Sequence, residues 1–480
     1  MAEKMVVVFV HGWSVTDTST YGALPEALAA QAGDHGLELD IQHIWLGKYV
    51  SFHDEVSMAD VARAFNRALL DRIPGTAGKI RVFSCVTHST GGPVVREWLN
   101  RFYGADDLAA SPMNHLVMLA PANHGSALAA LGKARVGRIK AWFSGVEPGQ
   151  RILDWLSLGS RQSIALAKAG MDYKIAGSGF YPFVLTGQSI DKKFYDFINS
   201  YLVEPGSDGV VRVAAANMNY SMIRLKETDK IKKVSHGPSD VDVHLLAVDG
   251  DIQRPDTIPL GVVPLASHSG DKKGIMGSVL SNKSSKPQVG EILKCFTVGN
   301  DAQYQARADE MKEMSEKTQK PTHKYAMLVF IIKDDQGDPV KDYDLFLLGG
   351  DDHDPDKLSK GFFVDRQQNA ANPNQLVYYV DYDVITKNKL TGFRVVARPE
   401  KGFAFYHSVE YRSPNGEIND ALKPNETFYV EIQLHRCVDK NVFGFDRADE
   451  YPLKKKGLLI KSYTRHSFKD IEPDAGEIDS

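Results

Sequence analysis

The chain has 480 residues, enough for more than one domain with its own hydrophobic core. Hydrophobic residues make up 43% and charged residues 25%, and the formal net charge of −4 gives no support to nucleic-acid binding, which requires a basic surface. Three widely separated cysteines, Cys85, Cys295 and Cys437, show neither metal-ligand spacing nor a disulfide framework. The sequence shows no secretory signal peptide and no apolar run long enough to span a bilayer, so any membrane contact is expected to be peripheral.

The first strand, at residues 6–10, is expected to be buried on both faces. Its almost continuous run of valine and phenylalanine is typical of a parallel sheet covered by helices. The strand ends at His11 and Gly12, where α/β-hydrolases place an oxyanion-binding loop. We expect the backbone N–H groups of Trp13 and Thr90 to bind the oxyanion, and His11 to shape the loop. Helical patterns at 24–30 and 59–72 continue the alternation of strand and helix.

A second buried strand, at residues 80–88, ends abruptly at Ser89. The residues around this serine, THSTGGP at 87–93, are typical of a nucleophile elbow, in which a strained turn lifts the hydroxyl above the sheet edge. The following helix points its N-terminus at the reacting oxygen. Thr87 replaces the first glycine of the usual G-x-S-x-G pattern, and an ordinary turn is the alternative. We predict that Ser89 is a catalytic nucleophile.

The acid and the base of a triad are expected after the serine, in that order. Asp208 lies in a glycine-flanked loop before apolar residues, where an acid could orient a histidine. Of the later histidines His236, His244 and His268, we favour His268 because its loop is polar and rich in glycine. His244 lies in a strand-like alternation and is the alternative base.

Two further expectations concern the chemistry of this region. His124, directly behind the strand at 115–120, is expected to shape a pocket wall rather than act as a base. No pair of histidines has the helical spacing of metal ligands, so we expect no metal in the catalytic core. Hydrolysis by a triad requires no cofactor, and none is predicted.

Residues 127–178 are expected to form a cap inserted into the hydrolase fold. Basic and apolar residues alternate within it, namely Lys133, Arg135, Arg138 and Lys140 with Val136, Ile139, Trp142 and Phe143. Such a stretch is typical of a membrane interface, and we predict that Arg138, Lys140, Trp142 and Phe143 contact membrane or substrate. A helix packed on its own core has the same periodicity and is the alternative. The basic tail around 454–456 is a second candidate membrane surface.

The remaining chain has a different character. Residues 301–320 are polar and helical and are predicted to connect the catalytic domain, 1–300, to a C-terminal domain, 321–480. Short strand-like runs separated by turns predict an antiparallel sandwich to about residue 434. The acidic loop at 350–356 is interpreted as solvated rather than as a calcium site, because a lysine stands where an EF-hand needs glycine.

Four stretches resemble one enzyme family. They are FVHGWSV at 9–15, THSTGG at 87–92, LAPANHGSA at 119–127 and GSDGVVRV at 206–213. Together they resemble the PlaB family, bacterial phospholipases A of the α/β-hydrolase class known from Legionella and Pseudomonas. The elbow with threonine in place of the first glycine is its most specific signature. The match is dense over about the first 220 residues and thinner beyond.

The resemblance implies phospholipase A and lysophospholipase A activity, and it supports Ser89 as nucleophile and Asp208 as acid. His268 depends on the argument from the residues alone. The resemblance further implies peripheral membrane association, at the outer membrane or cell surface of a bacterium, a homo-oligomer (dimer or tetramer) and a separate C-terminal domain. Two alternatives are open: a lipase or carboxylesterase acting on neutral esters, and a hydrolase-fold binding protein that has lost catalysis.

Overall fold

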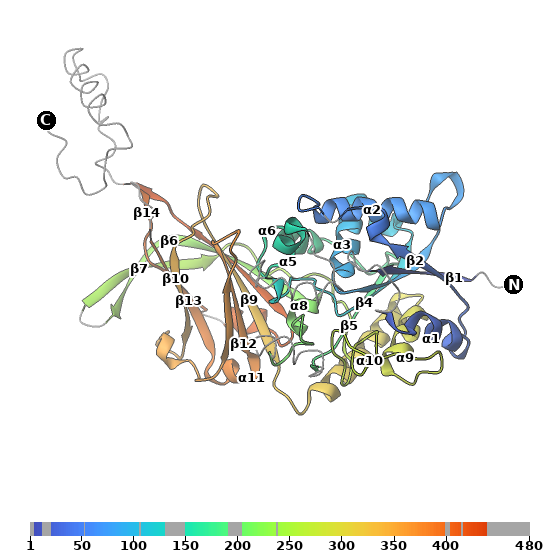
Figure 1. Ribbon diagram of the computed structural model, residues 1–480. Coiled ribbons are helices and arrows are strands. Elements are labelled where there is room, and N and C mark those ends of the chain that lie inside the picture. Colours follow the sequence, from blue (N-terminus) through green and yellow to red (C-terminus); the bar gives the residue numbers. More distant parts are fainter. Residues whose placement is uncertain are drawn as a thin grey trace, which may run out of the picture.

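The computed structural model describes residues 4–11, 21–51, 53–104, 107–129, 149–190, 204–236, 239–398, 404–413 and 416–438. The chain forms a six-stranded parallel sheet covered by helices and, beside it, a nine-stranded sheet (Figure 1). The predicted combination of an α/β-hydrolase part and a β-rich part is confirmed. None of the helices in these ranges is both long and apolar enough to cross a membrane.

The α/β part contains a parallel sheet with the strand order β2-β1-β3-β4-β5-β8. Its strands are β1 (Met5–His11), β2 (Leu39–Trp45), β3 (Phe83–His88), β4 (Met113–Leu119), β5 (Tyr181–Thr186) and β8 (Leu260–Val262). The helices are α1 (Leu24–Gln31), α2 (Met58–Arg72), α3 (Gly91–Phe102), α5 (Gln150–Leu156), α6 (Arg161–Gly170), α8 (Val213–Ala216), α9 (Pro287–Phe296) and α10 (Asp301–Gln319).

Helices cover both faces of this sheet, which explains the unbroken apolar run of β1. Val8 belongs to the core that contains Phe65 of α2 and Trp98 of α3. Its neighbour Phe9 points the opposite way, into the core that contains Leu28 of α1. In Figure 1, α2 and α3 accordingly lie above the strands while α1, α9 and α10 lie below. Every side chain of such a strand is removed from water, so alternation with polar residues is absent.

The second sheet has the order β10-β13-β15-β7-β6-β16-β9-β12-β11. Its strands are β6 (Tyr220–His236), β7 (Ser239–Val248), β9 (Tyr325–Asp334), β10 (Tyr343–Gly349), β11 (Phe363–Gln368), β12 (Gln375–Asp381), β13 (Leu390–Ala397), β15 (Val409–Arg412) and β16 (Thr427–Leu434). Two short helices, α11 (Tyr382–Ile385) and α12 (Glu417–Ala421), accompany it, and β14 (Ala404–Phe405) pairs with β17 (Cys437–Val438).

This sheet is mixed, which differs from the predicted antiparallel sandwich. Three of its pairings are parallel: β15 with β7, β16 with β6 and β16 with β9. In one of them Thr427 pairs with Tyr220, and such a distant partner cannot be recognised from local alternation. The correction therefore concerns how the strands are arranged, not that they form a β-rich part.

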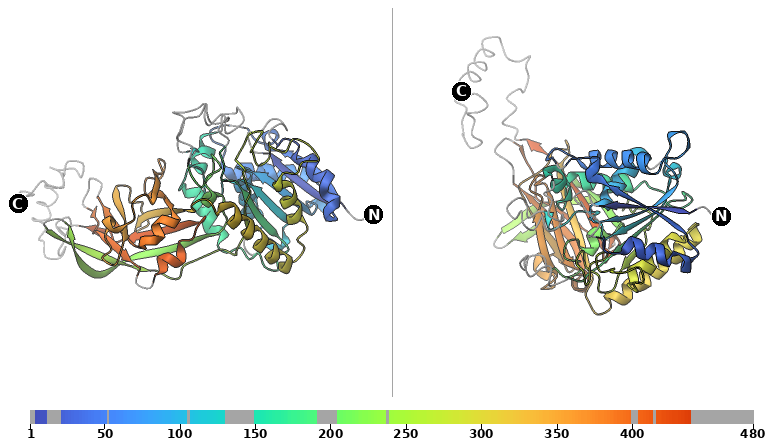
Figure 2. Two further views of the ribbon diagram at one scale, coloured as in Figure 1. Left: turned by 90° about the horizontal axis from the view of Figure 1, so that it is seen from below. Right: turned by 45° about the vertical axis from the view of Figure 1, so that its right-hand side comes forward.

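The two sheets share a hydrophobic core. Along β9, Val329 packs into the core that contains α3 and α6, whereas its neighbours Leu328 and Phe330 pack into a separate core between the nine-stranded sheet and α11 and α12. Figure 2 shows the two sheets side by side, with α5 and α6 near their junction. The β-rich part is therefore built against the hydrolase part rather than tethered to it.

The sequence ranges of the two parts differ from those predicted. Strands β6 and β7 lie within the predicted catalytic range 1–300 but pair in the nine-stranded sheet. Helix α10, predicted as a connector, packs on the parallel sheet: Met311 is fully buried, and the Ser315 hydroxyl accepts the Val262 N–H at 2.8 Å. In the predicted cap, α5 and α6 are packed in the main core, and residues 130–148 lie outside the described ranges.

Candidate active site

Ser89 occupies the turn between β3 and α3. Its φ of +53° lies in the left-handed region, which an L-residue other than glycine adopts only at a cost in free energy. Neighbouring backbone holds this conformation in place. The Ser89 N–H donates to the Leu119 carbonyl at 3.0 Å, and the Ser89 carbonyl accepts the Ala122 N–H at 3.2 Å. The strained turn is thus fastened to the end of β4, as a nucleophile elbow requires.

Close packing explains the two glycines after the serine. A Cβ atom on Gly92 would stand 2.7 Å from Cβ of Pro121, which is closer than real side chains approach. On Gly91 it would stand 3.3 Å from Cβ of Thr87. Thr87, at the place of the usual first glycine, is fully buried and fills the space that Gly91 leaves.

Three predicted residues meet at the carboxyl edge of the parallel sheet. Nδ1 of His268 donates to Oδ2 of Asp208 at 2.9 Å, and Nε2 of His268 lies 3.0 Å from Oγ of Ser89. With the proton on Nδ1, Nε2 is free to accept the serine proton. All three are buried, Asp208 completely and Ser89 to 7% exposure.

The Asp208 carboxylate is fixed by its own loop. Its second oxygen, Oδ1, accepts the N–H groups of Val210 at 3.0 Å and Val211 at 2.7 Å. The His268 N–H donates to the Asp208 carbonyl at 3.0 Å, so the main chains of acid and base are also joined. Hydrogen bonds of this kind leave the carboxylate one orientation, in which Oδ2 faces the imidazole.

The nine-stranded sheet supports the loop that carries Asp208. The Tyr379 hydroxyl on β12 contacts the carbonyls of Pro205 and Gly206, at 2.9 and 3.1 Å. Buried Arg212 pairs with Glu204 at 2.8 Å and lies over the Tyr379 ring, 4.2 Å from its centroid. The β-rich part therefore contacts the loop that carries Asp208, the predicted acid.

A second histidine, which the sequence did not single out, touches the site. His88 donates its Nε2–H to the His268 carbonyl at 3.2 Å, and the two rings stand 4.7 Å apart. Burial, and secondarily the neighbouring imidazole, hold the pKa of His88 well below its usual value, so the ring stays neutral. The position of His88 directly before Ser89 was the sequence signal that could have identified it. The pattern of a buried strand, however, indicates no functional role for this histidine.

The predicted oxyanion donors are described only in part. Thr90 precedes the first residue of α3, where backbone N–H groups have no partner within the helix. Trp13 lies outside the described residues, and His11 is described only as the last residue of β1. Of the two predicted oxyanion donors, Thr90 is therefore the one that lies within the described residues, at the N-terminal end of α3.

His124, which was not expected to act as a base, and His244, the alternative base, have other partners than Ser89 and Asp208. His124 accepts the Tyr429 hydroxyl at Nδ1, 2.7 Å away, and donates from Nε2 to the Asn217 carbonyl at 2.9 Å. Burial and, secondarily, the nearby Arg96 lower the pKa of His124 to about 3. His244 lies in the nine-stranded sheet, where Nδ1 is 3.1 Å from a Glu227 oxygen.

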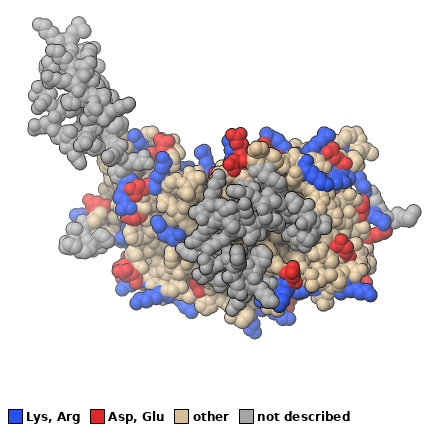
Figure 3. Space-filling view, in the orientation of Figure 1, with Lys and Arg blue, Asp and Glu red and all other residues tan. Residues whose placement is uncertain are grey.

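The predicted membrane-binding residues Arg138, Lys140, Trp142 and Phe143 lie outside the described residues, as does the basic tail at 454–456. On the described surface in Figure 3, basic and acidic side chains are interspersed rather than gathered by sign. Two exposed leucines are found near the histidine loop in sequence: Leu265 is 72% exposed and Leu280 is 70% exposed. These supply apolar surface on the described part of the chain.

Comparison with known proteins identifies the family. No protein-family model and no curated relative matches the chain. Phospholipase PlaB from Legionella pneumophila, in a structure with thio-NAD, is 40% identical with a TM-score of 0.82, covering 94% of this chain and 97% of that one. A second structure of that phospholipase is 41% identical with the same TM-score and coverage. Because identity at this level extends over nearly the full length of both chains, the chain belongs to the PlaB family of phospholipases.

Proposed function

We propose that Ser89, His268 and Asp208 are the catalytic triad of a phospholipase A and lysophospholipase A. The close similarity to PlaB shows an ester-hydrolysing enzyme of the phospholipase type. The observation that carries the residue roles is the continuous hydrogen-bonded path from Ser89 through His268 to Asp208. The strained φ of Ser89, at the end of a buried strand, adds independent support.

In the proposed mechanism, Nε2 of His268 takes the Ser89 proton as the hydroxyl attacks the acyl carbonyl of the lipid. Negative charge on the carbonyl oxygen is bound by the N–H of Thr90 and, as the sequence predicts, by that of Trp13. The resulting imidazolium is stabilised by Asp208, which keeps it oriented. His268 then returns the proton to the departing alcohol, and water, activated by the same base, hydrolyses the acyl-serine ester.

The substrate is proposed to be reached at a membrane surface. Phospholipid esters lie in the interfacial region, and the described helices include none that could span a bilayer. Surface elements must then supply the affinity, and the basic cap residues, the basic tail and the exposed leucines are the candidates. We further propose a bacterial outer-membrane or cell-surface location and a homo-oligomer, a dimer or tetramer.

Activity-based labelling combined with a lipid panel tests the proposal. A fluorophosphonate probe should label the wild-type chain and leave Ser89→Ala unlabelled, and the Ser89→Ala and His268→Ala variants should lose roughly 10⁴- to 10⁶-fold in kcat. His244→Ala, the matched control at the alternative histidine, should keep its activity. Loss of activity in His244→Ala but not in His268→Ala would reverse the assignment of the base.

The same panel separates the alternatives. Hydrolysis of phosphatidylcholine and lysophosphatidylcholine in preference to triglyceride supports a phospholipase, whereas the opposite preference supports a neutral lipase. A folded wild-type chain that the probe does not label would indicate a hydrolase-fold binding protein without catalysis.

A further inference from the structure

Three arginine side chains are buried within the described residues, and one of them, Arg96, forms no ion pair with a described carboxylate. The other two are each paired with two carboxylates: Arg212 with Glu204 and Asp365, and Arg307 with Glu291 and Glu310. Arg96 is 4% exposed, and its Nη1 donates to the Asn123 carbonyl at 3.1 Å. Charged groups are almost never buried so deeply unless they are paired, because removal from water destabilises a charge.

The pKa values of these arginines show the same difference. Burial lowers the pKa of Arg96. Burial acts on Arg212 in the same direction, but the hydrogen bond to Glu204 outweighs it and raises the pKa. Glu97, next to Arg96 in sequence, pairs instead with Arg101 at 3.0 Å.

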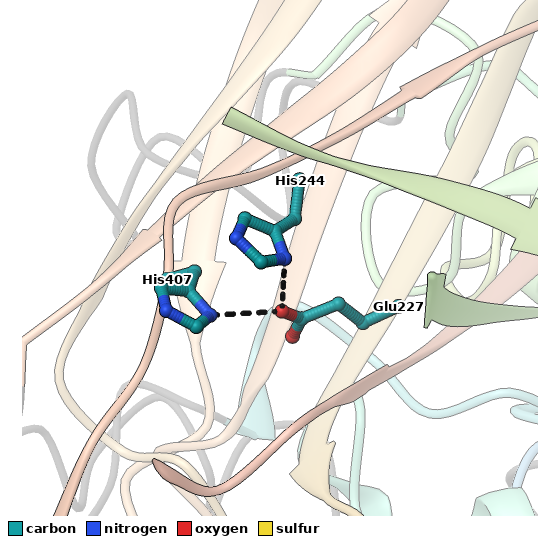
Figure 4. Close-up of side chains that lie close together, drawn as sticks. All are labelled: Glu227, His244 and His407. Carbon is teal, nitrogen blue, oxygen red and sulfur yellow. Dashed lines mark hydrogen bonds and ion pairs between the residues drawn. The ribbon is translucent and has the colours of Figure 1, made fainter. Parts of the chain in front are cut away.

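Two buried carboxylates of the nine-stranded sheet have clear partners. The Glu227 side chain is 5% exposed, and Figure 4 shows its carboxylate facing the imidazoles of His244 and His407, at 3.1 and 3.2 Å. Glu410 is fully buried and pairs with two arginines. Arg96 differs from these groups because no described residue balances its charge, and a buried polar group in this situation points to a bound ion or water.

A small cavity lies beside Arg96, between α3, α6, β4 and β5. Its volume is about 20 Å³, and most of the described side chains around it are apolar. Tyr173 also lines the cavity, and the Tyr173 hydroxyl is buried without a hydrogen-bond partner in the described residues. Asp256 is the carboxylate in the wall, but it accepts the Ile175 N–H at 2.7 Å and forms no ion pair with Arg96. A guanidinium and a hydroxyl therefore border one cavity in which neither has an acceptor.

The size and the donors of the cavity limit the ligand. A cavity needs at least about 10–15 Å³ to hold one water molecule, so this one holds a single small molecule or ion and no acyl chain. A water molecule could accept from both donors but would leave the guanidinium charge unbalanced. A small monovalent anion accepts from both donors and also balances that charge. Sulfate and phosphate are larger and require more donors than Arg96 and Tyr173 supply.

We propose that Arg96 and Tyr173 bind one chloride ion in this cavity. The ion accepts hydrogen bonds from the guanidinium and from the Tyr173 hydroxyl, and it supplies the negative charge that the described residues around Arg96 do not. The site is formed by residues other than Ser89, His268 and Asp208, and its occupation does not depend on the proposed reaction.

The ion stabilises the loop beside the nucleophile elbow. Arg96 belongs to α3, and its bond to the Asn123 carbonyl joins this helix to the loop after β4. In the same loop, the Ala122 N–H donates to the Ser89 carbonyl at 3.2 Å. Chloride, by fixing the Arg96 guanidinium, therefore strengthens the contact between α3 and the loop that holds the backbone of Ser89.

Thermal unfolding of the full chain in matched salts tests the proposal. The protein is dialysed against sodium gluconate, whose anion is too large for the cavity, and chloride then replaces gluconate at constant ionic strength. We expect a saturable rise in the Tm of the wild-type chain, about 1–2 °C at a chloride concentration ten times the Kd. Arg96→Met should lose this rise.

Tyr173→Phe tests the second donor with a smaller change. Because a hydrogen bond to a charged group is lost, the Kd for chloride should increase by at least about tenfold. In gluconate the variant should be at least as stable as wild type, since it no longer buries an unpartnered hydroxyl, whereas in saturating chloride it should be less stable. Tyr343→Phe is the matched control: its hydroxyl is also buried without a partner in the described residues, but Tyr343 belongs to the separate core of the nine-stranded sheet. The chloride response of Tyr343→Phe should equal that of wild type.

Bromide locates the ion without any variant, so this measurement decides even if Arg96→Met fails to fold. Crystals of the wild-type chain grown in sodium bromide should show an anomalous peak at the bromine absorption edge, within hydrogen-bond distance of Arg96 and Tyr173. The proposal is overturned if the cavity shows no such peak, or if chloride and gluconate give the same Tm. It is also overturned if Tyr173→Phe responds to chloride as strongly as Tyr343→Phe.

Discussion

His88 is a buried side chain outside the proposed triad that contacts its proposed base, His268. The serine, acid and base were predicted from their order along the chain and from their loops: Ser89 ends a buried strand, Asp208 lies in a glycine-flanked loop, and His268 lies in a polar loop rich in glycine. His88 lies inside a strand, and nothing in a run of buried residues indicates that one of them donates to the backbone of the base. Its hydrogen bond to the His268 carbonyl becomes visible only in three dimensions.

Replacing His88 should therefore reduce kcat without changing KM. A neutral hydrogen bond contributes about 1 kcal/mol, so His88→Ala is expected to lower kcat roughly fivefold by loosening His268. His88→Gln, which retains an N–H donor, should recover part of the loss. The matched control is His115→Ala, because His115 is also buried and donates to a carbonyl, that of Val298, at 2.7 Å. Equal losses of kcat in both variants would mean that only stability is involved.

Some helices and strands could be predicted from the sequence more completely than others. Strands β1, β3 and β4 are predictable because burial on both faces leaves an unmistakable apolar run. Residues 301–320, which form helix α10, were predicted as a connector because they are polar and helical. The structure buries only Arg307, Met311, Ser315 and Gln319 of this helix. So thin a stripe does not reveal that the helix packs on β8. The pairing of β16 with β6 joins segments that are distant in sequence, and no local pattern specifies it.

The loop between residues 204 and 211 gives a prediction at this scale. Gly206 has a φ of +69°, and a Cβ atom there would stand 2.5 Å from the Tyr325 ring and 2.6 Å from the Tyr379 hydroxyl. Gly206→Ala should push the loop away from β12 and displace Asp208. Since misplacement of a reacting group by about 1 Å can cost 100-fold, we expect kcat to fall by about that factor.

Gly250→Ala is the control for Gly206→Ala. Gly250 has a φ of +86°, so alanine is strained there too, but no atom lies within 4 Å of the added Cβ. We expect lower stability and unchanged kcat. Normal kcat in Gly206→Ala, measured on a short soluble ester, would show that the nine-stranded sheet does not position the acid.

The loop before His268 is expected to contact lipid. Leu265 has a φ of +57°, which is unfavourable for a residue other than glycine. Its apolar side chain is also 72% exposed, which is unfavourable in water. Leu265→Asn removes the apolar side chain and suits the left-handed backbone better. Burial of one leucine contributes about 1.5–3 kcal/mol, so activity on liposomes should fall by at least about tenfold, while hydrolysis of a soluble ester and thermal stability are maintained.

Val82→Asn provides the comparison for Leu265→Asn. Val82 is 60% exposed but precedes β3, at the sheet edge opposite Ser89. Liposome co-sedimentation of the two variants should therefore differ, and equal binding would place the lipid contact elsewhere.

At the scale of the whole molecule, the two sheets are joined by a buried carboxylate as well as by their common core. Glu431 on β16 is 2% exposed and pairs with Lys168 of α6, at 2.5 Å, with Lys333 of β9, at 2.6 Å, and with Arg224 of β6, at 3.4 Å. Lys168 belongs to the hydrolase part, whereas Lys333 and Arg224 belong to the nine-stranded sheet. The charge of Glu431 therefore contributes to the free energy that holds the parts together.

This junction should weaken in acid. Burial alone would raise the pKa of Glu431, but the two lysines outweigh it and lower the pKa from 4.5 to about 2. A lowered carboxyl pKa adds stability that is fully present above pH 4.5 and is lost as the pH falls towards 2. The shift corresponds to about 3 kcal/mol. Glu431→Gln should therefore destabilise the chain most at pH 7, and its difference from wild type in urea unfolding should shrink below about pH 4.5.

Glu426 provides a control, because its pKa is shifted in the opposite direction to that of Glu431. Burial raises the pKa of this carboxyl despite its ion pair with Arg254, so its contribution is greatest at low pH and declines as the pH rises through the raised pKa. Glu426→Gln should consequently become less destabilising, relative to wild type, from pH 3 to pH 7, while Glu431→Gln becomes more so. Other groups that titrate in acid, such as buried His124, affect the wild type and both variants equally. Their effect on the free energy of unfolding therefore cancels when each variant is compared with wild type. If both differences changed in the same direction with pH, the lysine pairs of Glu431 would not be what couples the two sheets.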